Sequence, residues 1–117
     1  MVFDKFVEIE FGGKKHKLCY PVKQVFVAER QLTDGNILLM LERASAGIPP
    51  NVYDMYIIIK YALMGGNPEL KEDEAEALYL AAVEEMPVVD VFKAGMKALV
   101  LSGVLGDPKK AGAAIMA

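Results

Sequence analysis

The start of the fold is decided by the stretch Phe6-Val-Glu-Ile-Glu-Phe-Gly-Gly-Lys-Lys-His-Lys-Leu-Cys-Tyr20. Within its first six residues, Val7, Ile9 and Phe11 alternate with Glu8 and Glu10, which is the period of a half-buried strand. Gly12-Gly13 can adopt the positive φ angles of a tight reversal. Pro21 then ends strand pairing, because proline has no amide hydrogen to donate. The stretch therefore predicts a β-hairpin with strands over Phe6–Phe11 and Lys15–Tyr20.

After Pro21 the apolar residues follow the period of a helix. A first helix is predicted over Val22–Leu32, with one face formed by Val22, Val25, Phe26, Glu29 and Leu32. The cluster Thr33–Asn36 is typical of a turn. A second helix is predicted over Ile37–Ala46, with Gly47 at its C-terminal end and Pro49-Pro50 as a break.

The segment Tyr53–Met64 is almost entirely apolar, and its only charged residues are Asp54 and Lys60. Three consecutive isoleucines, Ile57–Ile59, favour a strand by propensity alone. The length of the segment favours a helix, since a dozen apolar residues exceed a typical buried strand. We therefore predict a central buried helix that ends at Gly65-Gly66.

Two further helices are predicted in the second half of the chain. Asn67-Pro68 is predicted to open the fourth, with acidic residues over Glu69–Glu76 near its positive end. Its predicted buried stripe consists of Leu78, Tyr79, Ala82, Val83 and Met86. Pro87 is suited to begin a fifth helix over Val88–Val104. The fold class is thus α+β and mostly α, an N-terminal β-hairpin followed by a bundle of about five helices.

The 117 residues correspond to one domain, which we place at residues 3–105, with 106–117 as a flexible C-terminal tail. Charges within the first dozen residues argue against a secretory signal. The apolar run Ala98–Gly106 is far shorter than the roughly 20 residues of a membrane helix. Cys19 is the only cysteine, so no intramolecular disulfide can form. These features predict a cytoplasmic protein that does not enter the membrane.

The residues that carry chemistry are scarce. His16 is the only histidine, stands among lysines and is predicted to be solvated, and Cys19 should point to the opposite face of the strand. One cysteine and one histidine cannot form a zinc site, and Glu72–Glu76 lacks the spacing of a calcium loop. Gly12–Lys15 lacks the spacing of a phosphate loop. We predict no enzyme, no catalytic residue, no metal and no cofactor.

Charge and hydropathy indicate the kind of partner instead. The net charge of −3 gives no general attraction to nucleic acid, and none is expected as a partner. Apolar residues make up 54% of the chain, above the usual ~45–50%. A small domain has limited interior volume, so some of these side chains should reach the surface and bind another protein.

The predicted fifth helix has the clearest second apolar face. Its polar stripe consists of Asp90, Lys93 and Lys97, and its expected core face of Val88, Phe92, Gly95 and Leu99. A second apolar row runs through Val89, Met96 and Val100. Two interpretations are open: a neighbouring helix covers this row, or the row docks a partner. The candidate partner-binding residues are Val89, Phe92, Met96 and Val100.

The order of elements resembles the tail assembly chaperones of long-tailed, non-contractile-tail bacteriophages and prophages. The resemblance covers about residues 3–105. It is carried by the opening strand with its glycine turn, by Glu29-Arg30 before Asp34-Gly35, and by the apolar segment that ends at Gly65-Gly66. Asn67-Pro-Glu-Leu, followed by Glu72-Asp-Glu-Ala, completes it.

The resemblance implies a role in viral tail assembly. Such chaperones bind the long, apolar tape measure protein in the cytoplasm of the bacterial host, keep it soluble and help recruit tail tube subunits. The implied partners are therefore the tape measure protein and the tail tube protein. The alternative is a small bacterial adaptor or regulatory protein that acts by protein–protein binding, with a homo-oligomer formed through the predicted fifth helix.

Overall fold

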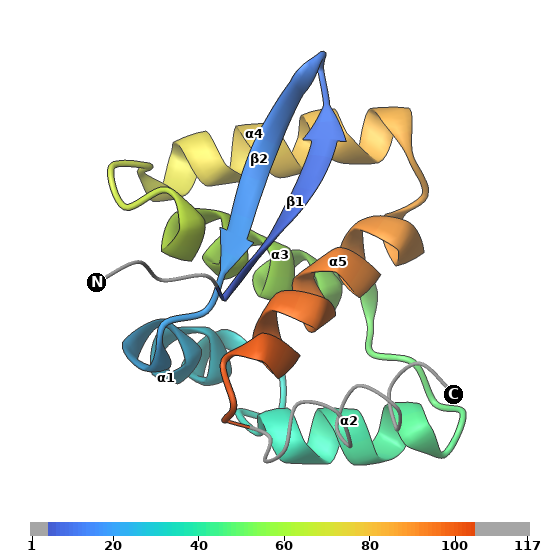
Figure 1. The fold of residues 1–117 in the computed structure, drawn as a ribbon. Coiled ribbons are helices and arrows are strands. Elements are labelled where there is room, and N and C mark those ends of the chain that lie inside the picture. Colours follow the sequence, from blue (N-terminus) through green and yellow to red (C-terminus); the bar gives the residue numbers. More distant parts are fainter. Residues whose placement is uncertain (1–4, 105–117) are drawn as a thin grey trace.

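The computed structural model describes residues 5–104, which form a two-stranded antiparallel hairpin followed by five helices (Figure 1). The predicted fold class, α+β and mostly α, is confirmed. The elements are β1 (Phe6–Phe11), β2 (Lys14–Cys19), α1 (Val22–Gln31), α2 (Ile37–Ser45), α3 (Val52–Gly66), α4 (Glu72–Glu85) and α5 (Val88–Leu101). The predicted tail, residues 106–117, lies outside the described residues.

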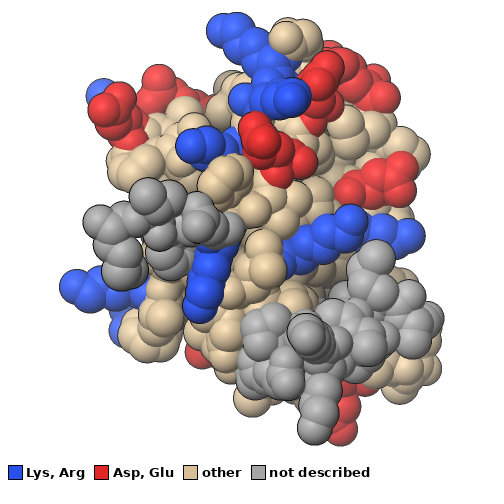
Figure 2. Space-filling model, in the orientation of Figure 1, with Lys and Arg blue, Asp and Glu red and all other residues tan. Residues whose placement is uncertain are grey.

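The hairpin forms around a two-residue turn, as the sequence predicts. Gly12 and Gly13 have φ angles of 61° and 73°, which match a type I′ turn. Phe11 pairs with Lys14, and the pairing continues in register to Phe6 and Cys19. The face away from the core carries glutamates on β1 and lysines on β2, and Figure 2 shows charges of both signs close together at this end of the molecule.

Helix α3 is the centre of the fold. The hairpin, α1, α4 and α5 all pack against it (Figure 1). Ile57, Ile58 and Ile59 are all buried, so apolar contacts surround the helix on every side at this level. Burial on all sides explains why the segment is apolar throughout without alternating as a strand would.

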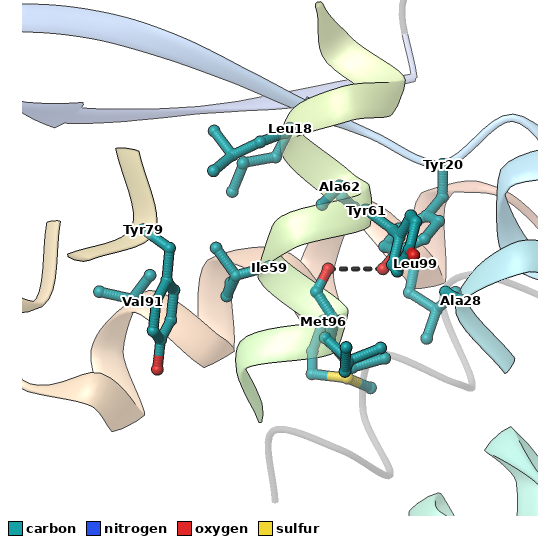
Figure 3. Packing of buried hydrophobic residues seen from close by; sticks show 14 of the residues in the cluster. Leu18, Tyr20, Ala28, Ile59, Tyr61, Ala62, Tyr79, Val91, Met96 and Leu99 are labelled. Atoms are coloured by element: carbon teal, nitrogen blue, oxygen red, sulfur yellow. Dashed lines mark hydrogen bonds between the residues drawn. The ribbon is translucent and has the colours of Figure 1, made fainter. Parts of the chain in front are cut away.

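A buried tyrosine fastens the hairpin to α3. The hydroxyl of Tyr20, directly after β2, donates a hydrogen bond of 2.5 Å to the carbonyl oxygen of Ile58 in the middle of the helix (Figure 3). Burial, together with the nearby Tyr61, raises the pKa of the Tyr20 phenol well above its ordinary value. The neutral hydroxyl therefore satisfies its hydrogen bond inside the core.

Gly65 and Gly66 lie within the last turn of α3, although the sequence predicts that the helix stops on reaching them. They let the helix approach β2 closely: a Cβ atom on Gly65 would lie 2.0 Å from the carbonyl oxygen of Cys19, and one on Gly66 would lie 2.2 Å from that of Lys17. Asn67 then ends the helix, since its Nδ2 donates to the carbonyl oxygens of Leu63 at 2.8 Å and Lys17 at 3.1 Å.

Helix α4 begins at Glu72, and its predicted start at Asn67-Pro68 is wrong. Asn67 is used to close α3, and its carbonyl oxygen accepts a turn hydrogen bond of 2.9 Å from the amide of Leu70. The amide of Lys71 donates to Glu74 Oε1 at 2.9 Å, which satisfies one of the free groups before the helix. The acidic residues of the first turn lie at the positive end of the helix dipole, as predicted.

The remaining boundaries are close to the predicted ones. Within the predicted stripe of α4, Tyr79 and Ala82 are buried, and the other three members are partly buried. Helix α5 ends at Leu101, three residues before the predicted end, because Gly103 has a φ of 81° and reverses the chain direction.

Candidate functional site

The apolar row predicted to bind a partner on α5 does not form an exposed surface. Met96 is only 2% exposed and Val100 only 8%, and Phe92 is partly buried. Val89, at 47%, is the one member of the four that is largely exposed. Of the two interpretations left open by the sequence, the one in which neighbouring elements cover the row therefore holds for Met96 and Val100, and their assignment to a free docking face is wrong.

The reason is the position of α5 between two neighbours. It packs against α3 on one side and against both strands of the hairpin on another (Figure 1). The contact with α3 is so close that a Cβ atom on Gly95 would lie 2.5 Å from Cδ1 of Ile59. Figure 3 shows Met96 and Val91 on α5 among the buried side chains around α3. The predicted polar stripe is correct, since Asp90, Lys93 and Lys97 are exposed.

Exposed apolar side chains gather instead on α1. Val22 and Phe26 are 50% and 54% exposed and lie one helical turn apart, and Val27 is adjacent to Phe26 and also exposed. We call Val22, Phe26 and Val27 the α1 patch. The opposite side of the helix, formed by Val25, Ala28 and Leu32, is buried.

The α1 patch corrects the predicted helix face, which grouped Val22 and Phe26 with buried residues. The missed signal is Ala28, because the spacing 25, 28, 32 alone gives a complete buried stripe. Phe26 lies about 100° around the helix from Val25, outside that stripe.

Other exposed apolar side chains are more scattered. Ile48, Val52 and Tyr53 lie in or after the connection between α2 and α3, and Leu38 lies near the start of α2. Single exposed apolar residues of this kind are normal on a protein surface. The α1 patch differs because its three members lie within two turns of one helix.

A small cavity with a mixed polar and apolar lining lies between the end of α1, α2 and the start of α3. It has a volume of about 220 Å³ and includes Asp54, Asp34 and Arg43 in its lining. Asp54 is buried, and its Oδ1 accepts hydrogen bonds of 2.9 Å from both the amide and the hydroxyl of Thr33. Arg43 forms an ion pair with Asp34 at the rim. The bonds to Asp54 fasten the loop after α1 to the first turn of α3, and the ion pair fastens the same loop to α2.

Lys60, Tyr61 and Glu72 connect α3 to the start of α4. Glu72 Oε1 accepts a hydrogen bond of 3.0 Å from the hydroxyl of Tyr61 and lies 3.3 Å from Nζ of Lys60. The hydrogen bond from Tyr61 and the charge of Lys60 lower the pKa of Glu72. The arrangement joins the two helices.

His16 and Cys19 project from opposite faces of β2, as predicted, so they form no dyad. His16 is half-buried rather than fully solvated, because its ring stacks on Phe11 with 3.9 Å between ring centroids. Burial raises the pKa of the Cys19 thiol, against the smaller effect of a backbone hydrogen bond with Tyr20. A neutral, buried thiol is a poor nucleophile.

Within residues 5–104, no three side chains of histidine, cysteine, aspartate or glutamate lie close enough to hold a metal ion. In the same part of the chain, every helix is too short or too polar to cross a membrane.

Comparison of the chain with known protein families, with curated proteins and with solved structures found no match.

Proposed function

We propose that this protein is a bacteriophage tail assembly chaperone that works in the bacterial cytoplasm. It binds the tape measure protein, keeps it soluble and helps recruit tail tube subunits. The observation that carries the proposal is the α1 patch, because a half-exposed phenylalanine beside two exposed valines offers apolar area without any accompanying chemistry. The role itself comes from the resemblance, which rests on the order of the elements along the sequence.

The α1 patch is suited to hold an apolar helix. Val22 and Phe26 lie about 40° apart around α1, so a client helix can lie along them with its own apolar stripe against this face. Val27 lies about 100° further around the helix than Phe26 and can contact only the edge of such a client. Lys23 and Arg30 are exposed between Phe26 and Val27 around the helix, and their long side chains can keep their charged ends hydrated beside such a contact. Binding of this kind is non-directional, which suits a client with many similar apolar stretches.

The experiment is co-expression with the tape measure protein encoded by the same genome, followed by pull-down and measurement of the soluble client. Phe26→Asp should lower binding by about tenfold or more, because a charge cannot be desolvated in an apolar contact. Leu80→Asp is the matched control, since Leu80 on α4 is also 54% exposed but stands outside the α1 patch. The control should bind as the wild type does.

Equal binding by both variants would overturn the proposal, provided that circular dichroism shows both to be folded. If Phe26→Asp instead abolishes a homo-oligomer and no client is captured by the wild-type protein, the adaptor interpretation replaces the chaperone.

A further inference from the structure

The two outer edges of the hairpin differ in whether another element covers their backbone groups. In a hairpin with a two-residue turn, the residues that flank the turn form a hydrogen-bonded pair, here Phe11 with Lys14. Alternate residues therefore turn their backbone N–H and C=O groups away from the partner strand. On β1 these are Glu10, Glu8 and Phe6, and on β2 they are Lys15, Lys17 and Cys19.

The edge of β2 is closed by the end of α3. The outward carbonyl oxygen of Lys17 accepts the hydrogen bond from Asn67 Nδ2 at 3.1 Å. The outward carbonyl oxygen of Cys19 lies against Gly65, where even one added methyl group would collide with it. No further strand can be added on this side without displacing α3.

The edge of β1 is open. Within residues 5–104, the backbone groups of Glu8 and Glu10 make no hydrogen bond, and both side chains are exposed. An edge strand with unpaired N–H and C=O groups is a template for another extended segment. The side chains on it set which segment fits.

We propose that the β1 edge binds an extended segment of a partner protein in which lysine or arginine alternates with apolar residues. Its basic side chains lie opposite Glu8 and Glu10, so each glutamate has a lysine of β2 on one side and a basic residue of the partner on the other. Its apolar side chains point to the other face of the sheet, the face on which β1 packs against α5. The proposal stands on a surface distinct from the α1 patch and does not depend on the chaperone role.

The charges select this partner over a second copy of the chain. Two β1 strands paired at their free edges place glutamates close to one another across the junction, and like charges in that position destabilise pairing. The edge of β2 in a second copy is covered by its own α3, as described above. A basic, alternating strand is the complement that remains.

The test uses the full chain and two synthetic peptides, Lys-Val-Lys-Val-Lys and Glu-Val-Glu-Val-Glu, both blocked at their ends. Amide hydrogen exchange followed by NMR reports directly on the edge. With the basic peptide at about ten times its Kd, exchange of the Glu8 and Glu10 amides should slow by about tenfold, and the acidic peptide should leave it unchanged. A basic peptide N-methylated at the amides that face β1 should give no protection, because it cannot form the ladder.

The variant Glu8→Gln with Glu10→Gln should bind the two peptides equally, since it keeps the backbone edge and removes its charge. Asp34→Asn with Glu42→Gln is the matched control, because it changes the net charge by the same amount at exposed sites in α2 and the loop before it, away from the hairpin (Figure 1). It should keep the preference for the basic peptide. Binding without protection of the Glu8 and Glu10 amides would overturn the proposal, as would concentration-dependent dimerisation of the free chain through this edge.

Discussion

Helices α5 and α1 both carry apolar side chains on more than one face, yet their surroundings differ. Helix α5 lies between α3 and the hairpin, so Met96 and Val100 are buried along with the expected core face. Helix α1 packs chiefly against α3 and leaves Phe26 half exposed. The exposure of an apolar side chain is therefore decided by how many neighbours a helix has, which its own periodicity does not reveal.

The difference between Met96 and Phe26 gives the largest expected effect. Met96→Ala should lower the free energy of unfolding by about 2–5 kcal/mol, because it leaves a cavity in the core. Phe26→Ala should change it by only about 0.5 kcal/mol, as is usual for surface positions. Urea denaturation of both variants measures the contrast, and equal losses would show that α1 and α5 are buried alike.

The second-largest expected effect concerns the hydrogen bonds between Asp54 on α3 and Thr33, which follows α1. Asp54→Ala removes the acceptor for both the amide and the hydroxyl of Thr33 and should cost about 1–3 kcal/mol. Hydrogen exchange of the Thr33 amide should accelerate at the same time. Asp54→Asn keeps an acceptor oxygen and should lose much less. If both substitutions behave alike, the hydrogen bonds do not hold α1 in place.

Gly65 and Gly95 allow two close contacts of α3 to be compared, one with β2 and one with α5. Gly65→Ala should cost about 1–2 kcal/mol, because the new methyl group meets the backbone of β2, and the gain in helix propensity only partly offsets the strain. Gly95→Ala should cost less, since its methyl group meets side chains and no backbone: Cδ1 of Ile59, at the end of a rotatable side chain, and Cγ2 of Ile58 at 3.2 Å. Thermal melts of the two variants test this order, and the reverse order would place the tighter contact at α5.

The smallest effect concerns the exposed junction of α3 and α4. The pKa of Glu72 is lowered in the folded state, so its contribution to stability is present above the ordinary glutamate pKa of about 4.3 and is lost as the pH falls through the folded value. Glu72→Gln should therefore flatten the dependence of the melting temperature on pH in the acid range. An unchanged profile would show that Tyr61 and Lys60 do not stabilise the charged carboxylate.

Local features of the fold were predictable from the sequence. The alternation from Phe6 to Phe11 and the glycine pair gave the hairpin, because strand period and turn chemistry are both local properties. The length of the apolar segment identified α3 as a helix despite its isoleucines. The start of α4 was misplaced because Asn67 is engaged by Lys17, a contact between residues fifty positions apart.

The candidate surface could be predicted less well than the fold. A surplus of apolar residues indicated some exposed apolar area, but the choice of α5 over α1 required knowledge of what packs on each helix. Val89 is exposed as expected, while Met96 and Val100 are buried by neighbours that a helical wheel does not include. The covering of the β2 edge by α3 could not be predicted from the sequence either, since the close approach of Gly65 and Gly66 to β2 depends on the tertiary fold.

The bond between Tyr20 and Ile58 gives the molecule an optical reporter of its own. The chain has five tyrosines and no tryptophan, and Tyr20 is the one held deepest in the core. Its raised pKa means that stability is intact below the ordinary phenol value of about 10 and declines as the pH rises beyond it. In an alkaline titration followed by ultraviolet absorbance, the last tyrosinate should appear together with the loss of the far-ultraviolet dichroism of the helices.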